Sequence, residues 1–185
     1  FKKVDTVMSP SIYLQDFFKK NDLKVVYLPN SINIKSFPFD RTKIIPFSLL
    51  WVRAFTEIYN PELAVKTLYE IKKEFPLARL TMIGPDKGLL TDVMQLIKKL
   101  NLLDSIDVLG PVNNDQLYKY YQTHSVFLNT TSYESYGVAV MEAVSCGIPI
   151  ISTSVGELPF LWEDNENILL IEKISTKAAD ITLTS

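Results

Sequence analysis

The sequence contains little of what several classes of protein depend on. Its 185 residues include one cysteine, so no disulfide can form within the chain, and a reducing compartment such as the cytoplasm fits better than secretion. No apolar run approaches the roughly 20 residues that a membrane-spanning helix requires. The 19 basic and 21 acidic residues give a net charge of −2, which leaves no positive excess. We therefore expect no membrane-spanning segment and no nucleic-acid partner.

Length and composition predict one folded domain. A chain of 185 residues can bury a sizeable core but is short for two domains. Hydrophobic residues make up 47% and charged residues 22%, which is typical of a globular chain. The chain begins at Phe1 without a signal-peptide pattern and stops at Ser185, shortly into an expected helix. We interpret residues 1–185 as one domain excised from a longer, two-domain protein.

Short apolar runs alternate with longer amphipathic ones. The short runs resemble strands buried on both faces and are Val4–Met8, Lys24–Leu28, Phe47–Val52, Arg79–Ile83, Ile106–Leu109, Ser125–Leu128, Pro149–Ser152 and Ile168–Ile171. Helical spacing occurs in Pro61–Glu74, Leu89–Leu100, Asn114–Gln122, Tyr136–Cys146 and Glu157–Trp162. This alternation predicts an α/β fold, a doubly wound Rossmann-like parallel sheet with helices on both faces. The segment Ser31–Pro46 is the most loop-like, and we expect it near an interdomain hinge.

The most informative stretch is Asn129–Glu157. A buried strand leads into a polar loop with Glu134, Gly137 opens a helix that carries Glu142, and Gly147 ends that helix. Free amides at a helix start attract phosphate oxygens, and a glycine there allows a ligand to approach closely. The two glutamates are separated by about 12 Å if the segment is helical. This arrangement predicts a nucleotide-diphosphate sugar, with its ribose and its sugar at the two carboxylates and its diphosphate between them.

The same stretch resembles the Glu-x7-Glu signature of retaining glycosyltransferases of the GT-B fold, family 4. The match is carried by Glu134-Ser-Tyr-Gly-x4-Glu142-Ala-x3-Gly147-x-Pro149, in which glutamates, glycines and proline are all in register. The resemblance covers most of the chain and includes Tyr27–Ile32, Met82–Asp86, Val108–Val112 and Ser154–Pro159. It implies the C-terminal, donor-binding half of a GT-B fold, without the N-terminal half that would hold the acceptor.

The resemblance also implies roles for single residues. Glu142 would bind the ribose. Glu134 would act as a catalytic residue beside the donor sugar, holding its hydroxyls or supporting a developing oxocarbenium charge. Arg53, the second catalytic residue, would grip the diphosphate, a task that suits a planar guanidinium. The main chain would supply the remaining contacts, to sugar and phosphate from Ser135, Tyr136, Gly137 and Val138, and to the base from Val112.

One position departs from the family pattern. The family usually has a lysine about six residues after that arginine, whereas the segment from Arg53 through Tyr59 to Pro61 contains none. Lys66 and Lys87 lie nearby in sequence but do not match the motif. Because charge stabilisation is often the largest catalytic contribution, the domain uses another cation, works differently or is weak. No Asp-x-Asp motif is present, and the resemblance implies neither a metal nor a cofactor besides the donor.

Three further features have structural interpretations. We expect His124, which precedes a strand, to play a structural role, although histidine is the usual first suspect for a base. Cys146 is interpreted as a buried, inert thiol. The acidic run Glu163–Glu166 is interpreted as a solvent-facing turn, and we expect no metal there.

The sequence therefore predicts the donor-binding domain of a retaining glycosyltransferase. The complete protein would transfer a sugar to a glycan or lipid-linked glycan, as in polysaccharide biosynthesis, and the isolated domain would be inactive or weak. The missing lysine motivates an alternative, a non-catalytic nucleotide-sugar-binding or interaction module derived from such an enzyme. A remoter alternative is a sugar-nucleotide epimerase, which the Glu-Ser-Tyr-Gly loop disfavours. Acceptor choice and any peripheral membrane contact would belong to the absent half.

Overall fold

The computed structural model describes residues 4–166 and 168–171, which contain two parallel sheets. The main sheet has six strands in the order β5-β4-β3-β6-β7-β8, and every neighbouring pair is parallel. Its strands are β3 (Ile45–Val52), β4 (Arg79–Ile83), β5 (Ile106–Gly110), β6 (His124–Asn129), β7 (Ile150–Thr153) and β8 (Leu169–Ile171). The second sheet pairs β1 (Val7–Ser9) with β2 (Val25–Tyr27), which are joined by the helix α1 (Ile12–Lys19).

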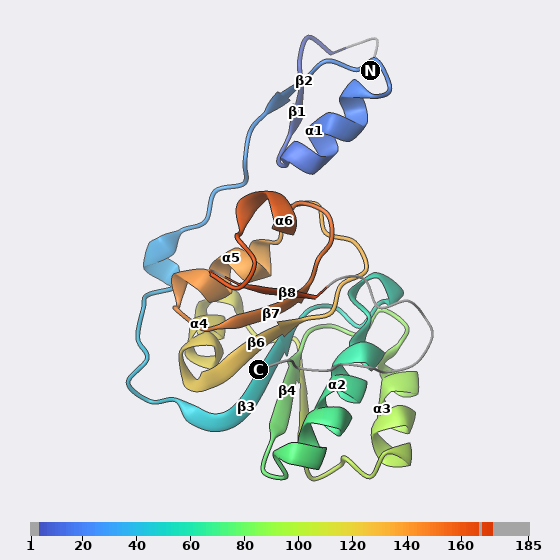
Figure 1. The fold of residues 1–185 in the computed structure, drawn as a ribbon, viewed down its shortest axis with the longest axis vertical. Helices are drawn as coiled ribbons and strands as arrows, with labels where there is room; N and C mark the ends of the chain where they lie inside the picture. The colour runs from blue at the N-terminus through green and yellow to red at the C-terminus, as the bar shows by residue number, and fades with distance from the viewer. Residues whose placement is uncertain (1–3, 167, 172–185) are drawn as a thin grey trace.

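Helices cover both faces of the main sheet (Figure 1). A core cluster around Trp51 and Phe55 lies on the side of α2 and α3, and another around Tyr121 and Phe127 lies on the side of α4 and α5. The helices are α2 (Pro61–Glu74), α3 (Leu90–Lys99), α4 (Asn114–Thr123), α5 (Val138–Ser145) and the short α6 (Leu158–Leu161), with 3-10 turns η1 (Ile34–Ser36) and η2 (Glu57–Tyr59). The predicted α/β fold with a parallel sheet is confirmed.

Element boundaries agree with the prediction where local capping is strong. Helix α2 occupies the predicted range because the side chain of Asn60 accepts the N–H of Leu63 and Pro61 takes the first helical position. Strand β4 also occupies its predicted range, and the remaining predicted strands and helices are found with ends shifted by a few residues. Helix α1 was not predicted, although Ser11 caps it by accepting the N–H of Leu14. The helix expected at the C-terminal end lies outside the described residues.

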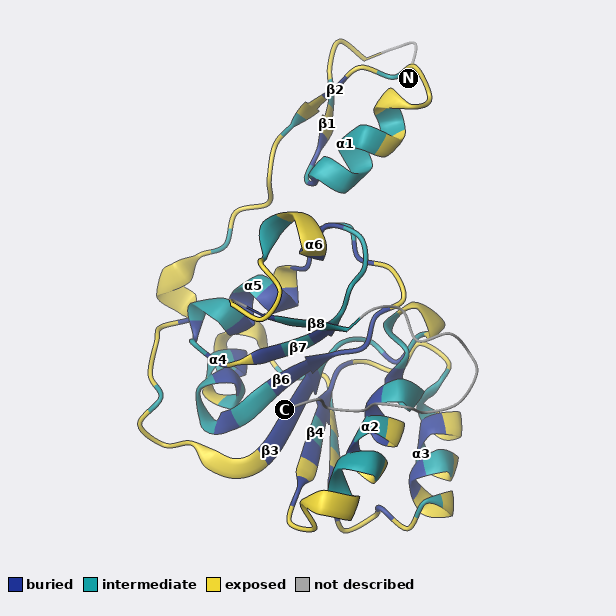
Figure 2. Ribbon diagram, in the orientation of Figure 1, coloured by how far each residue is buried: buried dark blue, intermediate teal, exposed yellow. Residues whose placement is uncertain are grey.

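The unit formed by β1, α1 and β2 stands apart from the main sheet, and an extended segment connects the two (Figure 1). Figure 2 shows the central strands of the main sheet largely buried, whereas each strand of the small sheet includes an exposed residue. Met8 is 59% exposed and Val26 is 49% exposed. The interpretation of residues 1–185 as one domain stays a prediction.

The loop-like segment Ser31–Pro46 packs against the side of the main sheet that α4 and α5 cover. Phe37 is 4% exposed within the cluster of α4 and α5. Nη1 of Arg41 donates to three carbonyl oxygens at the end of α4, at 3.0, 3.1 and 2.7 Å, namely those of Tyr121, Gln122 and His124. A cation at this end satisfies carbonyls that the helix leaves unpaired. The side chains of Phe37 and Arg41 therefore hold this segment against the rest of the molecule.

The carboxyl ends of the parallel strands meet at one edge of the main sheet, where ligands of such sheets bind. Arg53 follows β3, Val112 follows β5, and the loop with Glu134 follows β6. The turn that contains Gly156 follows β7. Sheet order thus gathers the predicted site residues at this edge. Separately, none of the helices in the described part of the chain is long and apolar enough to cross a lipid bilayer.

Candidate functional site

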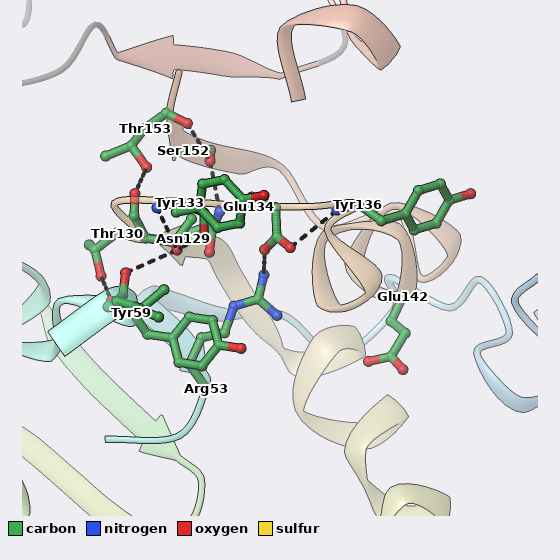
Figure 3. Close-up of polar contacts among 12 residues, drawn as sticks. Arg53, Tyr59, Asn129, Thr130, Tyr133, Glu134, Tyr136, Glu142, Ser152 and Thr153 are labelled. Atoms are coloured by element: carbon green, nitrogen blue, oxygen red, sulfur yellow. Dashed lines mark hydrogen bonds and ion pairs between the residues drawn. The ribbon is translucent and has the colours of Figure 1, made fainter. Parts of the chain in front are cut away.

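The centre of the site is an ion pair between Arg53 and Glu134 (Figure 3). Nη2 of Arg53 donates to Oε2 of Glu134 at 2.7 Å, and each side chain is 11% exposed. The adjacent strands β3 and β6 bring together these residues, which lie 81 positions apart. The other carboxylate oxygen of Glu134 accepts the backbone N–H of Tyr136 at 3.4 Å. Both oxygens of Glu134 are therefore held in place.

Arg53 keeps donor capacity that its bond to Glu134 does not use. Its Nε is buried and has no hydrogen-bond partner within the described structure. The ring of Tyr59 lies 5.3 Å from the guanidinium carbon, a cation–π distance. A buried N–H without a partner is unfavourable unless a ligand or a water molecule meets it. This arginine is thus suited to receive an anion.

Glu142 lies on α5 and is 9% exposed. The hydroxyl of Tyr121 donates to its Oε2 at 3.1 Å. Burial raises the pKa of Glu142, while the Tyr121 bond and the positive charge of Arg53 act in the opposite direction. The field of Arg53 therefore reaches Glu142 as well as Glu134. Burial, followed by the charge of Glu142, raises the pKa of Tyr121 well above its usual value, so this hydroxyl stays protonated and donates.

The start of α5 lies between the two glutamates in the chain and carries no side-chain cap. Its cap residue is Gly137, whose φ of 89° lies in the left-handed region that favours glycine. A Cβ at Gly137 would also come within 2.9 Å of Cδ2 of Leu158. The first amides of the helix, beginning with the 42% exposed Val138, have no partner within the helix. This end of α5 offers N–H donors and a positive dipole end to an anion.

The other predicted donor-binding residues are Ser135, Tyr136 and Val112, and they lie at different places around this site. Ser135 is half-buried in the loop between Glu134 and α5. The ring of Tyr136 points away from Arg53 in Figure 3, and its hydroxyl donates to the carbonyl oxygen of Asn30 at 2.9 Å, so only its main chain faces the site. Val112 follows β5, two strands from β3, at the far part of the same edge. Its predicted contact with the base stays a prediction.

Thr130 connects the turn η2 to the loop that leads to Glu134, and the sequence does not predict this role. Its hydroxyl accepts the indole N–H of Trp51 at 2.9 Å and bonds the carbonyl oxygens of Tyr59 and Asn60 at 2.9 Å each. These bonds join the turn η2 to the loop that leads to Glu134. A single threonine after a strand carries no signal of such a network, because its partners lie 70 to 79 positions away.

The position of the missing lysine is occupied by an aromatic ring. Tyr59, six residues after Arg53, is the residue that stacks on its guanidinium. Lys66 lies on an exposed face of α2 and pairs with Glu62 at 3.0 Å. Lys87 is exposed in the turn after β4. The described site therefore contains one arginine as its fixed cation, with a phenol beside it.

His124 and Cys146 have structural surroundings, as predicted. Nδ1 of His124 lies 2.8 Å from the carbonyl oxygen of Tyr120, and Nε2 lies 2.9 Å from Oγ1 of Thr81. Burial lowers the pKa of His124. The thiol of Cys146 is fully buried, and burial raises its pKa to about 11, which disfavours a nucleophilic thiolate. In the described residues no group of three or more His, Cys, Asp or Glu side chains is arranged to hold a metal ion.

An apolar groove of about 230 Å³ lies away from these residues. It is bounded by α2 and by the side of β6 and β7 that faces α2, and Leu63, Ile71, Leu128 and Ile151 are among its lining residues. Because α5 packs on the opposite face, this groove is separate from the site of Arg53 and the two glutamates.

Comparison with solved structures defines the class of the protein. The chain resembles the pneumococcal O-GlcNAc transferase GtfA, solved with UDP and GlcNAc, with a TM-score of 0.81 and 26% identity over 96% of this chain and 36% of that one. It resembles sucrose-phosphate synthase from Thermosynechococcus elongatus with a TM-score of 0.81 and 21% identity over 94% and 46% of the two chains. The fold is a Rossmann-like α/β domain, one half of a GT-B fold.

Residues 36–182 match the family described as glycosyl transferases group 1, and the chain belongs to this family. It is a glycosyltransferase domain. The gpi3 subunit of phosphatidylinositol N-acetylglucosaminyltransferase from Schizosaccharomyces pombe is 29% identical over 141 residues, which is 75% of this chain and 31% of that protein. Alpha-monoglucosyldiacylglycerol synthase from Acholeplasma laidlawii is 27% identical over 185 residues, which is 90% of this chain and 45% of that protein.

The chain thus spans less than half the length of these two relatives. Family membership favours an enzyme over the alternative of a non-catalytic module.

Proposed function

We propose that this domain binds a nucleotide-diphosphate sugar across the start of α5, and that the complete protein transfers the sugar to an acceptor. The observation that carries the proposal is the arrangement of two carboxylates and one guanidinium around an uncapped helix start. Glu142 accepts the ribose hydroxyls and Glu134 accepts those of the sugar. Arg53 and the first amides of α5 hold the diphosphate, because each of them can donate to phosphate oxygens.

Transfer proceeds with retention of configuration in this proposal. Glu134 is tied to Arg53 and to the amide of Tyr136, so it is placed to stabilise positive charge on the sugar rather than to attack it. The acceptor attacks from the face that the diphosphate leaves, assisted by the leaving phosphate. Arg53 neutralises the charge that develops on that phosphate, and electrostatic stabilisation of this kind is often the largest catalytic contribution.

Tyr59 takes part in place of the family's lysine. Its ring restrains the guanidinium of Arg53 at 5.3 Å, and its hydroxyl supplies a neutral donor near the diphosphate. A phenol stabilises a leaving diphosphate less than an ammonium does, because it contributes no net charge. No metal is required in this proposal, since Arg53 and the start of α5 supply the positive field.

The substrates follow from the relatives as proposals. GtfA was solved with UDP and GlcNAc, so UDP is the first nucleotide to test. The names of the two relatives contain the lipids phosphatidylinositol and diacylglycerol, which supports a glycan or lipid-linked glycan acceptor, as in cell-surface polysaccharide assembly. The remainder of the protein would hold that acceptor and make any peripheral contact with the cytoplasmic face of a membrane.

A calorimetric titration with UDP tests the donor site. Glu142→Ala removes the ribose acceptor, and we expect UDP affinity to fall by roughly tenfold or more, the range for a hydrogen bond to a charged group. The matched control is Glu62→Ala, which removes an exposed glutamate of α2. Equal affinities in wild type and Glu142→Ala, with both proteins folded by circular dichroism, would contradict the ribose role.

A further inference from the structure

Glu157 is a buried carboxylate that the proposed donor site does not use. The residue as a whole is 0% exposed, compared with 9% for the residues Glu134 and Glu142. Among the residues that the structure describes, none of the ion pairs involves Glu157. A carboxylate buried without a cation is strongly unfavourable unless hydrogen-bond donors surround it. Its partners therefore indicate what it does.

Those partners are the first amides of α1. The backbone N–H of Ile12 donates to Oε1 of Glu157 at 2.9 Å, and the N–H of Tyr13 donates to Oε2 at 2.8 Å. Ser11 caps the next position by accepting the N–H of Leu14 at 3.1 Å. The positive end of the helix dipole adds to the attraction for the carboxylate. Helix α1 is thus capped by a side chain 145 positions away, and Figure 1 shows its start directed toward α6.

The backbone of Glu157 contacts the loop between β6 and α5 that carries Glu134, the Glu134 loop. Its N–H donates to the carbonyl oxygen of Glu134 at 3.3 Å. The preceding Gly156 has a φ of 59°, and a Cβ there would overlap that same carbonyl oxygen. The close approach requires glycine, because any side chain would push the turn and the Glu134 loop apart. Glu157 therefore contacts α1 through its side chain and the Glu134 loop through its main chain.

Two more contacts join the same parts of the molecule. The ring of Tyr13 meets the ring of Tyr133 edge to face, with centroids 6.0 Å apart. The hydroxyl of Tyr136 donates to the carbonyl oxygen of Asn30, which lies just after β2. Tyr133 and Tyr136 lie on either side of Glu134 in the chain, so α1 and the segment after β2 contact the Glu134 loop on both sides of that glutamate.

We propose that Glu157 is a positioning residue that locks the start of α1 onto the Glu134 loop, so that the unit of β1, α1 and β2 and this loop act as one body. The effect on catalysis rests on the proposed function of Glu134. Losing the lock loosens the sugar end of the site, whereas Glu142 and the nucleotide end are untouched. Turnover should therefore fall while UDP affinity is retained.

The test compares Glu157→Gln and Glu157→Ala with wild type in the complete protein. Glutamine keeps the shape but faces one helix amide with an N–H₂ group instead of an acceptor, and alanine removes both acceptors. The matched control is Glu166→Gln, because Glu166 is an exposed glutamate. Amide hydrogen exchange at Ile12 and Tyr13 reports the lock itself. We expect exchange to accelerate by about tenfold or more at both amides in Glu157→Ala, at the amide that loses its acceptor in Glu157→Gln, and at neither in the control.

The functional readout separates positioning from folding. UDP affinity should stay within about twofold of wild type, and kcat for UDP release should fall by about tenfold or more, since the lost bonds involve a charged acceptor. The substrate is the UDP-sugar that raises the melting temperature of wild type most. Glu157→Gln keeps the experiment decisive if Glu157→Ala does not fold.

Unchanged exchange at Ile12 and Tyr13 would overturn the lock, whatever the substrate. A parallel loss of kcat and UDP affinity, or an unchanged kcat, would overturn the positioning role. If no UDP-sugar stabilises wild type and UDP does not bind, the proposed UDP-dependent function fails, while the exchange experiment still decides whether Glu157 holds α1.

Discussion

Arg53 is the residue that both carboxylates of the site share. It pairs with Glu134 at 2.7 Å, lowers the pKa of Glu142 against the effect of burial, and is stacked by Tyr59. The guanidinium is bonded to Glu134, and its positive charge partly offsets the effect of burial on Glu142. Substitutions around Arg53 should therefore affect nucleotide binding more than folding.

Substitutions of Tyr59 separate its ring from its hydroxyl. Tyr59→Phe keeps the stacked ring, so we expect UDP affinity to fall only by about threefold to tenfold, the value of one neutral hydrogen bond. Tyr59→Lys introduces a second cation and should raise UDP affinity and the rate of donor cleavage, with a stronger dependence on salt. Titration calorimetry at low and high salt measures both effects. Tighter binding by the phenylalanine variant would contradict the donor role of the hydroxyl.

Glu142→Gln should raise stability at neutral pH while weakening UDP binding. Because burial raises the pKa of Glu142 above its usual value of 4.5, the folded protein holds the proton more tightly than the unfolded chain does. Stability of wild type is therefore lost as pH rises from the usual value through the raised one, and the glutamine variant does not show this loss. Urea unfolding at a series of pH values measures the difference. Identical pH profiles would show that Glu142 is not destabilised by burial.

At the scale of elements, the site depends on how η2 and β6 are joined. Thr130 bonds Trp51 in β3 and the carbonyl oxygens of Tyr59 and Asn60, and so connects three parts of the chain around the turn that carries Tyr59. The cap of α2 at Asn60 is part of the same network. The position of Tyr59 over Arg53 therefore depends on a hydroxyl outside the site.

Thr130→Val keeps the shape of the side chain and removes the hydroxyl. The buried indole N–H of Trp51 then has no acceptor, and we expect the free energy of unfolding to fall by about 1–3 kcal/mol. Chemical denaturation monitored by tryptophan fluorescence measures the change. The exposed Thr42→Val is the comparison and should stay within about 0.5 kcal/mol of wild type. A loss below that level in Thr130→Val would mean that the network contributes little.

At the scale of the whole molecule, two sheets are held together by a connecting segment and by contacts at Glu157, Tyr133 and Tyr136. The edge that carries the proposed donor site belongs to the larger sheet, and the start of α1 contacts Glu157 in the turn after β7 at that edge. A ligand that binds this edge binds only the folded protein, because the edge does not exist in the unfolded chain. Such a ligand should therefore raise the free energy of unfolding.

A saturating nucleotide should raise the melting temperature of the protein. At a ligand concentration of about 100 Kd, the stabilisation is about 2.7 kcal/mol, which corresponds to a shift of about 5–11 °C for a chain of this size. A thermal-shift screen of UDP-, GDP- and ADP-sugars measures it, and Arg53→Met is the control that should lose the shift. A shift of equal size in Arg53→Met would place the nucleotide elsewhere.

Local features of the sequence were sufficient to predict most of the fold. The apolar runs mark the strands, and Asn60 with Pro61 marks the start of α2, because propensity and capping act between residues close in the chain. The Glu-x7-Glu pattern likewise indicated Glu134, Glu142 and the helix start between them, since all three lie within one loop and helix. The family and the α/β class were therefore accessible from the sequence alone.

Only the tertiary structure decided which distant residues meet. The pairing of Arg53 with Glu134, the network of Thr130 and the bond from Glu157 to Ile12 join residues 70 to 145 positions apart. The separation of β1 and β2 from the main sheet was likewise hidden, because their sequences resemble those of other buried strands. Such contacts depend on strand order and on which apolar faces pack together, and no local pattern in the chain records either.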